Sequence, residues 1–496
     1  MLYIRMFLVM GVSLYTSRIV LAELGVVDYG IFNVVGGIIV MFSFINGAMA
    51  SSTQRFLSFE IGRGNTQQLE KTFKTAVTIH LIIAGSILIL AETVGLWFLN
   101  SVMNIPHDKI VAANWVFQCS VLGYIISIIQ VPYSASIIAR ESMSFYAYMG
   151  IVDVCIRLGI AFSLGLVVSG KLILYSSLLF GVAVLSFIIY SSYSRHKFKE
   201  CKFGWLYEKA QFKEMASYAG WSTFGSLAWA GKSQGLNILL NVFFGPTVNA
   251  AYGVANQVNV AVNNFVQNFT TALNPQIVKN YSSGNYTEMR KLVIYGAKFS
   301  FFLMLVIAFP VIMIADQLLH FWLVKVPEYA VVFTQLVIIN TLIESFTFSM
   351  GTGIQATGNI KWYQIIVGGT LLLNIPISYL LLKLYLFPPI VFFTNILLSC
   401  ITIGERLIVM RNQIPGFSIL NFCKKVYIPA GIICSICGGI YYLTHCKLNI
   451  SNYHFIYVAL ISFVLAFGLE WLIGLNHRER NKIVGIIFAK FKIRRG

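Results

Sequence analysis

Long apolar runs are the feature that most constrains how this chain folds. Fourteen of them, each long enough to cross a bilayer, fill nearly all of its 496 residues. A membrane-spanning helix needs about 20 apolar residues, and in hydrocarbon every backbone polar group must be bonded within the protein. Only 11% of the residues are charged, whereas soluble domains carry about 25%. The sequence therefore predicts an all-α integral membrane protein with about 14 transmembrane helices.

Breaker residues and hydropathy set the predicted spans. They are 1–22, 30–60, 73–100, 112–139, 143–168, 171–194, 215–243, 249–280, 292–320, 328–356, 361–384, 386–411, 420–444 and 452–474. The first run lacks a small-residue cleavage site, so we interpret it as a retained helix and not as a signal peptide. Whether a short leader precedes it is left open.

The distribution of Lys and Arg predicts the orientation. With a cytoplasmic N-terminus, 25 of the 36 basic residues fall in inner loops and the tail, and 5 fall in outer loops. This bias follows the positive-inside rule and predicts that both termini are cytoplasmic. It also accounts for the net charge of +18, because basic residues on the inner face meet anionic phospholipid. Nucleic-acid binding is not needed to explain the charge.

An internal repeat divides the chain. At a shift of 220 residues, Gly25 aligns with Gly245, Gly64 with Gly284, Asn65 with Asn285 and Lys71 with Lys291. Six spans per half give a parallel repeat, and transporters place substrates between such halves. The predicted domains are a six-helix bundle at 1–194, a basic amphipathic linker at 195–214, a second six-helix bundle at 215–411, two additional spans at 412–474 and a basic cytoplasmic tail at 475–496. We expect the linker to be a helix lying on the inner surface.

The eighth span is long enough to cross a membrane, but it is rich in amides. Residues 249–276 contain ten Asn or Gln and no charge. At 100° per residue, one side of this helix carries an amide stripe that includes Asn256, Asn259, Asn263, Gln267 and Asn274. An unpartnered amide in hydrocarbon costs several kcal/mol. The stripe therefore favours a helix that lines a water-filled cavity, with dry polar packing as the alternative.

Charged residues within the spans are further site candidates. Lys232 lies near the middle of the seventh span, and Glu344 near the middle of the tenth. A lone central Lys is costly in a bilayer, so Lys232 should face water, an acid or an anionic substrate. Glu344 is either a proton or cation site or the partner of Lys232 or Arg157.

The remaining candidates lie in the first half of the chain. Asp153 and Arg157, four residues apart, suit a helical ion pair that is structural or part of a site. Arg18 and Arg55 are candidate cations at the entrance, since the Arg fork suits phosphate.

Motifs for catalysis or metal binding are not found. The sequence contains no nucleotide-binding Gly-rich loop, no HExxH and no GxSxG, and its His residues are scattered. Cys434 and Cys437 have C-x-x-C spacing but lie inside an apolar run, where core packing is the preferred interpretation over metal. We expect no metal, no cofactor and no enzymatic activity. Coupling to an H⁺ or Na⁺ gradient or to the membrane potential is left open.

Three stretches of the first 150 residues carry a family resemblance. They are LYTSRIVLAELGVVDYGIFNVVGGIIVMFSFINGAMASSTQRFLSFEIGRGN, ETVGLWFLN and QVPYSASIIARE. They resemble polysaccharide flippases of the multidrug/oligosaccharidyl-lipid/polysaccharide exporter superfamily. The resemblance implies two six-helix bundles around a central cavity lined by spans one, two, seven and eight. It also implies alternating-access transport of lipid-linked oligosaccharides across the bacterial inner membrane for surface polysaccharide such as lipopolysaccharide O-antigen.

The expected substrate is an undecaprenyl-diphosphate oligosaccharide. Cavity cations (Lys232, with Arg18 or Arg55) would bind the diphosphate, and the amides would bind glycan hydroxyls. The polysaccharide polymerase machinery is a candidate partner. Two alternatives are kept: a drug or cation exporter of the same superfamily, and a membrane-embedded polysaccharide polymerase or glycosyltransferase. The glycan, the coupling ion, the oligomeric state and the resting state stay open.

Overall fold

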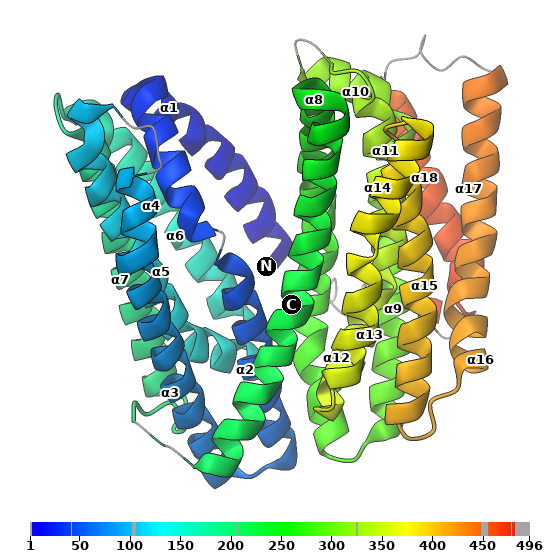
Figure 1. Cartoon of the computed structure of the whole chain (residues 1–496). Helices are drawn as coiled ribbons and strands as arrows, with labels where there is room; N and C mark the ends of the chain where they lie inside the picture. The colour runs from blue at the N-terminus through cyan, green and yellow to red at the C-terminus, as the bar shows by residue number, and fades with distance from the viewer. Residues whose placement is uncertain are drawn as a thin grey trace, which may run out of the picture. The chain divides into compact units, whose positions relative to one another are not determined.

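The computed structural model describes residues 2–40, 42–101, 106–204, 206, 208–323, 326–447, 455–477 and 479–481, and within these ranges the chain forms helices and no strand (Figure 1). The α-helices are α1 (Leu2–Val40), α2 (Ser43–Arg63), α3 (Thr66–Leu90), α4 (Leu96–Ser101), α5 (Ile110–Ala139), α6 (Met143–Ser163), α7 (Lys171–Lys197), α8 (Lys209–Ser282), α9 (Tyr286–Met313), α10 (Ala315–Trp322), α11 (Ala330–Ser345), α12 (Thr347–Thr357), α13 (Lys361–Leu372), α14 (Asn374–Tyr385), α15 (Ile390–Gln413), α16 (Ile419–Phe422), α17 (Ile428–Lys447) and α18 (Phe455–Leu469). Short 3₁₀ or π segments are η1 (Ala91–Gly95), η2 (His107–Lys109), η3 (Leu164–Leu166), η4 (Cys423–Tyr427) and η6 (Glu470–Gly474).

Helices occupy most of the described residues of each predicted span, with turns or coil at 42, 167–168, 314, 328–329, 346, 373 and 386–389. By length and composition alone, ten helices of the described chain can cross a membrane, or eleven if the bent pair α11–α12 is one span. Neither α2 nor α8 is among them, because hydroxyls, amides and charges interrupt their apolar runs. The chain is therefore an all-α, multi-pass membrane protein, as the sequence predicts. The orientation of its termini and its location in the inner membrane stay predictions.

The backbone of four glycines supports the internal repeat. Gly25 breaks α1 with φ 76° and ψ 168°, and its repeat partner Gly245 breaks α8 with φ 78° and ψ −171°. Gly64 and Gly284, the second aligned pair, have φ of 72° and 77°. Residues with a Cβ avoid this region, whereas glycine enters it freely. A positive φ therefore recurs at both members of each aligned pair.

Two compact units make up the structure. The first unit comprises 1–230, 274–285 and 355–365, and the second comprises 231–273, 286–354 and 366–496. The predicted boundary at 195–214 falls inside the first unit, and the predicted domains stay a prediction. The helices α8, α12 and α13 each run from one unit into the other.

The first unit packs around α5, which contacts α1, α2, α3 and α7. Its core includes Phe73, Phe117 and Tyr133, all fully buried. Tyr133 also meets Phe73 edge to face at 5.3 Å between ring centroids, a geometry that aromatic quadrupoles favour. These contacts fix α3, α5 and α7 as a block that holds the rest of the unit.

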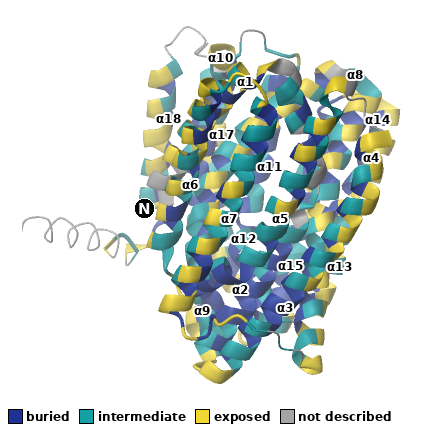
Figure 2. Cartoon of the chain, turned by 90° about the vertical axis from the view of Figure 1, so that its left-hand side faces the viewer, coloured by how far each residue is buried: buried dark blue, intermediate teal, exposed yellow. Residues whose placement is uncertain are grey.

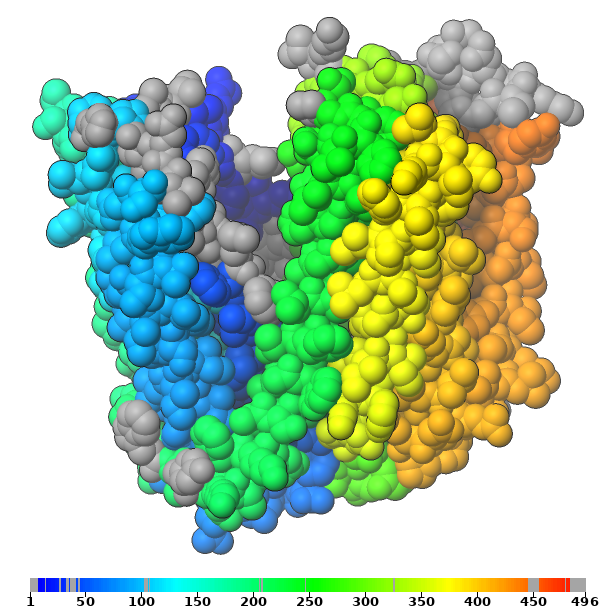
Figure 3. All heavy atoms as spheres, viewed as in Figure 1, coloured from blue at the N-terminus to red at the C-terminus, as the bar shows by residue number. Residues whose placement is uncertain are grey.

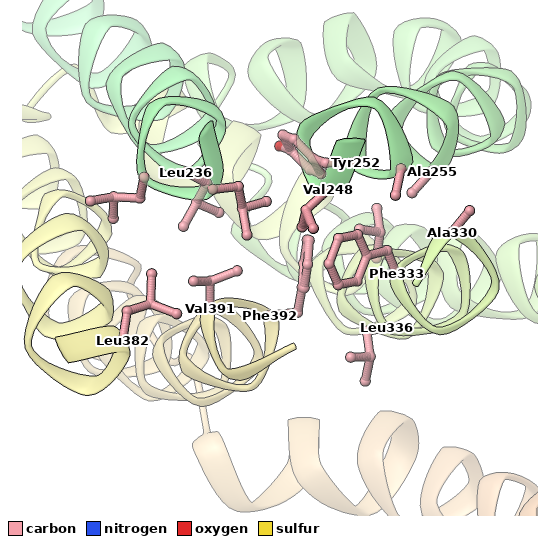
Figure 4. Close-up of a cluster of buried hydrophobic side chains, with 14 of the residues drawn as sticks. Leu236, Val248, Tyr252, Ala255, Ala330, Phe333, Leu336, Leu382, Val391 and Phe392 are labelled. Atoms are coloured by element: carbon pink, nitrogen blue, oxygen red, sulfur yellow. The ribbon is translucent and has the colours of Figure 1, made fainter. Parts of the chain in front are cut away.

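The second unit is built around α9. In the most apolar 18-residue stretch of α9, 72% of the residues are buried, against 22% in the corresponding stretch that includes α18. The outer helix α18 shows exposed turns along its length in Figure 2. A separate cluster joins α8, α11, α14 and α15, with Phe333 and Phe392 at its centre (Figure 4). Burial of two such rings stabilises the unit by several kcal/mol, at about 1.5–3 kcal/mol each.

The predicted surface helix over the linker is wrong. α7 continues to Lys197, the described residues of 198–208 are not helical, and α8 begins at Lys209. The segment is instead held by specific contacts with the first unit, since Glu200 pairs with Arg140 at 2.6 Å and Cys201 is fully buried. These side chains cannot lie on a lipid surface and fill the unit at the same time. Of the predicted tail, 478 and 482–496 lie outside the described residues.

Candidate amide face and polar core of the second unit

The amide-rich part of α8 has one exposed side and one buried side. Its exposed residues are Gly253, Asn256, Gln257, Val260, Asn264 and Gln267. We call this set the amide face. On the opposite side Ala251, Ala255 and Val266 are fully buried. In Figure 3, α8 (green) lies beside α13 and α14 (yellow), where Gly231 and Gly235 allow contact with Leu372 and Ile375.

The exposed side is rotated from the stripe predicted by the helical wheel. Asn256 and Gln267 are exposed as expected, but Asn259 and Asn263 are partly buried. The Asn259 Oδ1 accepts a hydrogen bond of 2.6 Å from the Thr341 hydroxyl of α11. The Oδ1 atoms of Asn263 and Asn249 are buried and have no hydrogen-bond partner among the described residues. The stripe is therefore both a surface and a packing seam, because the small Ala251 and Ala255 draw α8 close to α11. Asn274, the last predicted amide, is half-buried and belongs to the first unit.

Water access along the amide face can be tested with single cysteines. We expect Asn256→Cys and Gln267→Cys to react with a membrane-impermeant methanethiosulfonate, because their side chains are exposed on a polar face. Val262→Cys and Val266→Cys, on the buried side, should not react. Labelling is measured by mass spectrometry against the background of the native cysteines. Equal protection at all four positions would show that lipid or protein covers the face.

Lys232 and Glu344 form an ion pair inside the second unit. The Lys232 Nζ lies 2.9 Å from the Glu344 Oε1, and the Lys232 side chain is only 7% exposed. Ser399 of α15 donates to the same carboxylate oxygen at 3.2 Å, and Asn340 also hydrogen-bonds Glu344. Of the partners that the sequence allows for Glu344, the structure therefore selects Lys232.

This pairing changes the role predicted for Lys232. An ammonium that is buried and neutralised by a carboxylate is not available to a substrate diphosphate unless the pair separates. Removing one member of such a pair leaves an uncompensated buried charge. The position of Lys232 thus argues for a structural role, in which it holds the first part of α8 against α11.

A second polar group lies in the same unit and was missed from the sequence. Asn374 of α14 donates to the Asn395 Oδ1 at 3.2 Å, and Ser378 donates to the Asn374 Oδ1 at 3.0 Å. Asn395 and Ser399 are four residues apart on α15, so one face of this helix meets both polar groups. That spacing was the available signal. Single amides in otherwise apolar runs, however, gave no reason to join α14 and α15.

The charges predicted in the first unit divide into three kinds. Asp153 and Arg157 form the expected i,i+4 pair at 2.8 Å and are partly exposed. Arg18 is exposed, and no ion pair is found for it within the described residues. Arg55 is not an entrance cation, because it is only 6% exposed and its guanidinium donates to the backbone oxygens of Gln355 and Ala356. Every residue has a backbone oxygen, so the sequence does not show which residues accept from Arg55, and this role could not be predicted from it.

Within the part of the chain that the structure describes, no three His, Cys, Asp or Glu side chains come together as a possible metal site. Cys434 and Cys437 are free thiols. The chemistry offered by the described site is therefore hydrogen bonding by amides and hydroxyls beside one neutralised ion pair.

Part of the sequence matches a known protein family. A family model described as MatE matches residues 233–380, which include the amide face and Glu344 and begin directly after Lys232. A comparison with curated proteins finds no match for the sequence.

Solved structures of MATE transporters share the fold over most of the chain. An outward-facing multidrug resistance MATE family transporter of the MOP superfamily has a TM-score of 0.71 and 12% identity, covering 83% of this chain and 95% of that chain. A MATE structure in complex with MaL6 has a TM-score of 0.69 and 12% identity, with the same coverage. A MOP superfamily transporter from Pyrococcus furiosus, described by the reverse polarity of its binding pocket, has a TM-score of 0.68 and 12% identity, covering 82% and 94%. At this identity the likeness shows the fold alone.

Proposed function

We propose that the protein is a flippase that moves undecaprenyl-diphosphate-linked oligosaccharides across the bacterial inner membrane by alternating access. The observation that carries the proposal is the exposed, uncharged amide face of α8. Support also comes from the shared fold of MATE transporters and from the flippase-like stretches in the first 150 residues. Surface polysaccharide synthesis, including O-antigen, is the process that such an activity would serve.

The amide face suits a glycan chemically. Each Asn or Gln side chain both donates and accepts hydrogen bonds, as sugar hydroxyls do. Asn256, Gln257, Asn264 and Gln267 are all exposed and lie within about three helical turns of one another. One face can therefore contact a hydroxyl-rich substrate at several points without any charge. Arg18, exposed on α1, is the proposed contact for the diphosphate.

A drug or cation exporter is the second candidate, because one similar structure is a multidrug resistance transporter. Binding an organic cation calls for an accessible carboxylate. Glu344, however, is paired with Lys232 at 2.9 Å, and residues 249–276 contain no acid. The polar face and the neutralised acid therefore favour the glycan over the cation. Anionic phospholipid at the inner leaflet and the polymerase machinery are the proposed partners.

Reconstitution distinguishes the two candidates. Purified protein in proteoliposomes should flip a fluorescent lipid-diphosphate oligosaccharide at least tenfold faster than protein-free vesicles, because the face can replace the water around the glycan. It should not accelerate uptake of a lipophilic cation dye under an imposed H⁺ or Na⁺ gradient. Both substrates are assayed in the same vesicles. Cation uptake without lipid flipping would contradict the flippase and support the drug or cation exporter.

A further inference from the structure

Arg55 joins two distant segments of the first unit. The Arg55 Nε donates to the Gln355 oxygen at 3.2 Å, and its Nη2 donates to the Ala356 oxygen at 3.1 Å. Both oxygens belong to the last turn of α12, where carbonyls lack the usual i+4 partner, and the Gln355 oxygen also accepts from the Gly358 N–H at 3.1 Å. The positive guanidinium also complements the negative end of the helix dipole. Arg55 is thus a cap supplied by α2 to a helix about 300 residues away.

The cap is held in place by aromatic rings. The guanidinium lies 4.6 Å from the ring centroid of Phe56, 4.8 Å from that of Phe59 and 5.3 Å from that of Tyr218. Tyr218 also donates to the Gln355 oxygen at 3.4 Å, and Ser51 donates to the Gln355 side chain at 3.3 Å. This group of contacts therefore ties α2 and the beginning of α8 to the end of α12.

A second tie lies on the last turns of α8. The Lys279 Nζ is 2.6 Å from the Glu141 Oε1, and Gln276 donates to the Glu141 Oε2 at 3.3 Å. Glu141 adopts φ 58°, a conformation that non-glycine residues avoid. Gly62 of α2 meets the same turns so closely that a Cβ there would come within 2.0 Å of the Ser282 Oγ. The end of α8 is thus fastened by a partly exposed ion pair and a glycine contact.

Both fastened segments continue into the second unit, because α8 and α12 each cross the division of the chain. Their attachments include the Arg55 hydrogen bonds and the Glu141–Lys279 ion pair, which can be exchanged for water, beside buried apolar side chains such as Ile277 and Val278. The contacts lie at the end of the first unit that the Lys and Arg distribution assigns to the cytoplasm.

We propose that Arg55 and the Glu141–Lys279 pair form a releasable latch that closes the cytoplasmic side in one transport state. This inference rests on the proposed function. The latch holds the ends of α12 and α8 on α2 and on the α5–α6 loop. When Arg55 releases the two α12 carbonyls, the ends of α12 and α8 can move away from α2 and from the α5–α6 loop, and the rest of each helix moves with its end.

A distance measurement tests the latch without any transport assay. Spin labels are placed at Gln67→Cys and Asn359→Cys, both exposed, and read by pulsed EPR in liposomes. Arg55→Gln, which removes the two-pronged donor, should raise the longer-distance population at least threefold. Arg55→Lys keeps the charge but not the fork and should give an intermediate result. Arg63→Gln is the matched control, because Arg63 stacks on Phe59 at 4.5 Å but is exposed, and it should leave the distribution unchanged.

A cross-link decides the question even where the Arg55 variants fail to fold. Ser51→Cys and Gln355→Cys are joined by a short bis-methanethiosulfonate, and lipid flipping is measured before and after reduction. We expect at least a tenfold loss in the joined protein, recovery with dithiothreitol, and no loss in either single-cysteine variant. Full flipping by the joined protein, or unchanged distances in both folded Arg55 variants, would overturn the latch. Absence of flipping in wild type would instead refute the proposed function, and the EPR result would then decide the latch alone.

Discussion

Lys232→Ala is expected to lower the free energy of unfolding by about 3–5 kcal/mol, because it leaves the Glu344 carboxylate inside the second unit without its counter-charge. Ser399 and Asn340 would remain as hydrogen-bond donors, but they carry no charge. The variant should reach the membrane at a reduced level. In detergent, its thermal midpoint should lie several degrees below that of wild type.

Two variants serve as controls for this result. Lys232→Ala combined with Glu344→Gln should recover most of the lost stability, since no buried charge then remains. Lys291→Ala removes the Lys291–Glu288 pair, whose side chains are 53% and 49% exposed, and should change stability by less than about 1 kcal/mol. A stable Lys232→Ala protein that has lost transport would instead return Lys232 to direct substrate contact.

Replacing the exposed amides is expected to abolish transport while leaving the fold intact. Asn256→Leu, Asn264→Leu and Gln267→Leu together remove three hydrogen-bonding side chains from the amide face. At about 1 kcal/mol for each bond, substrate binding should weaken on the order of a hundredfold. Since these side chains are exposed, the thermal midpoint should stay close to that of wild type.

A matched change on the same face tests whether polarity is the property that matters. Val260 is 52% exposed, and Val260→Leu adds apolar volume without removing an amide. It should retain at least half of the wild-type flipping rate. Equal loss in Val260→Leu and in the amide variant would indicate that shape, and not hydrogen bonding, sets the activity of this face.

Much of the fold was accessible from the sequence because the bilayer permits few structures. Apolar runs of span length predict helices, and the aligned glycines Gly25 and Gly245 mark breaks with nearly identical backbone angles. The surface helix expected over the linker was misjudged, because a basic, aromatic segment suits a membrane surface as well as it suits a packed loop. Only the tertiary contacts of Glu200 and Cys201 distinguish the packed loop from a helix on the membrane surface.

The site was less accessible, for a different physical reason. Periodicity located the amide stripe, but the neighbour of α8 determines which side of it is exposed. Asn259 turns toward Thr341, 82 residues away, and no local pattern encodes that contact. Lys232 and Glu344 were recognised as costly residues, and their pairing was one of several options until the structure brought them to 2.9 Å. Arg55 binds backbone oxygens, which every residue has.

Flipping of a lipid-diphosphate oligosaccharide by the purified protein is the most direct test of the account. Proteoliposomes carry the fluorescent lipid in both leaflets, and an impermeant quencher reports how fast the protected half becomes accessible. We predict rapid, complete quenching with wild type and with Val260→Leu, and the slow rate of protein-free vesicles with the triple amide variant. Equal quenching rates in wild type, in the triple amide variant and in protein-free vesicles would contradict the assignment of the α8 amide face as the substrate-binding surface of a flippase.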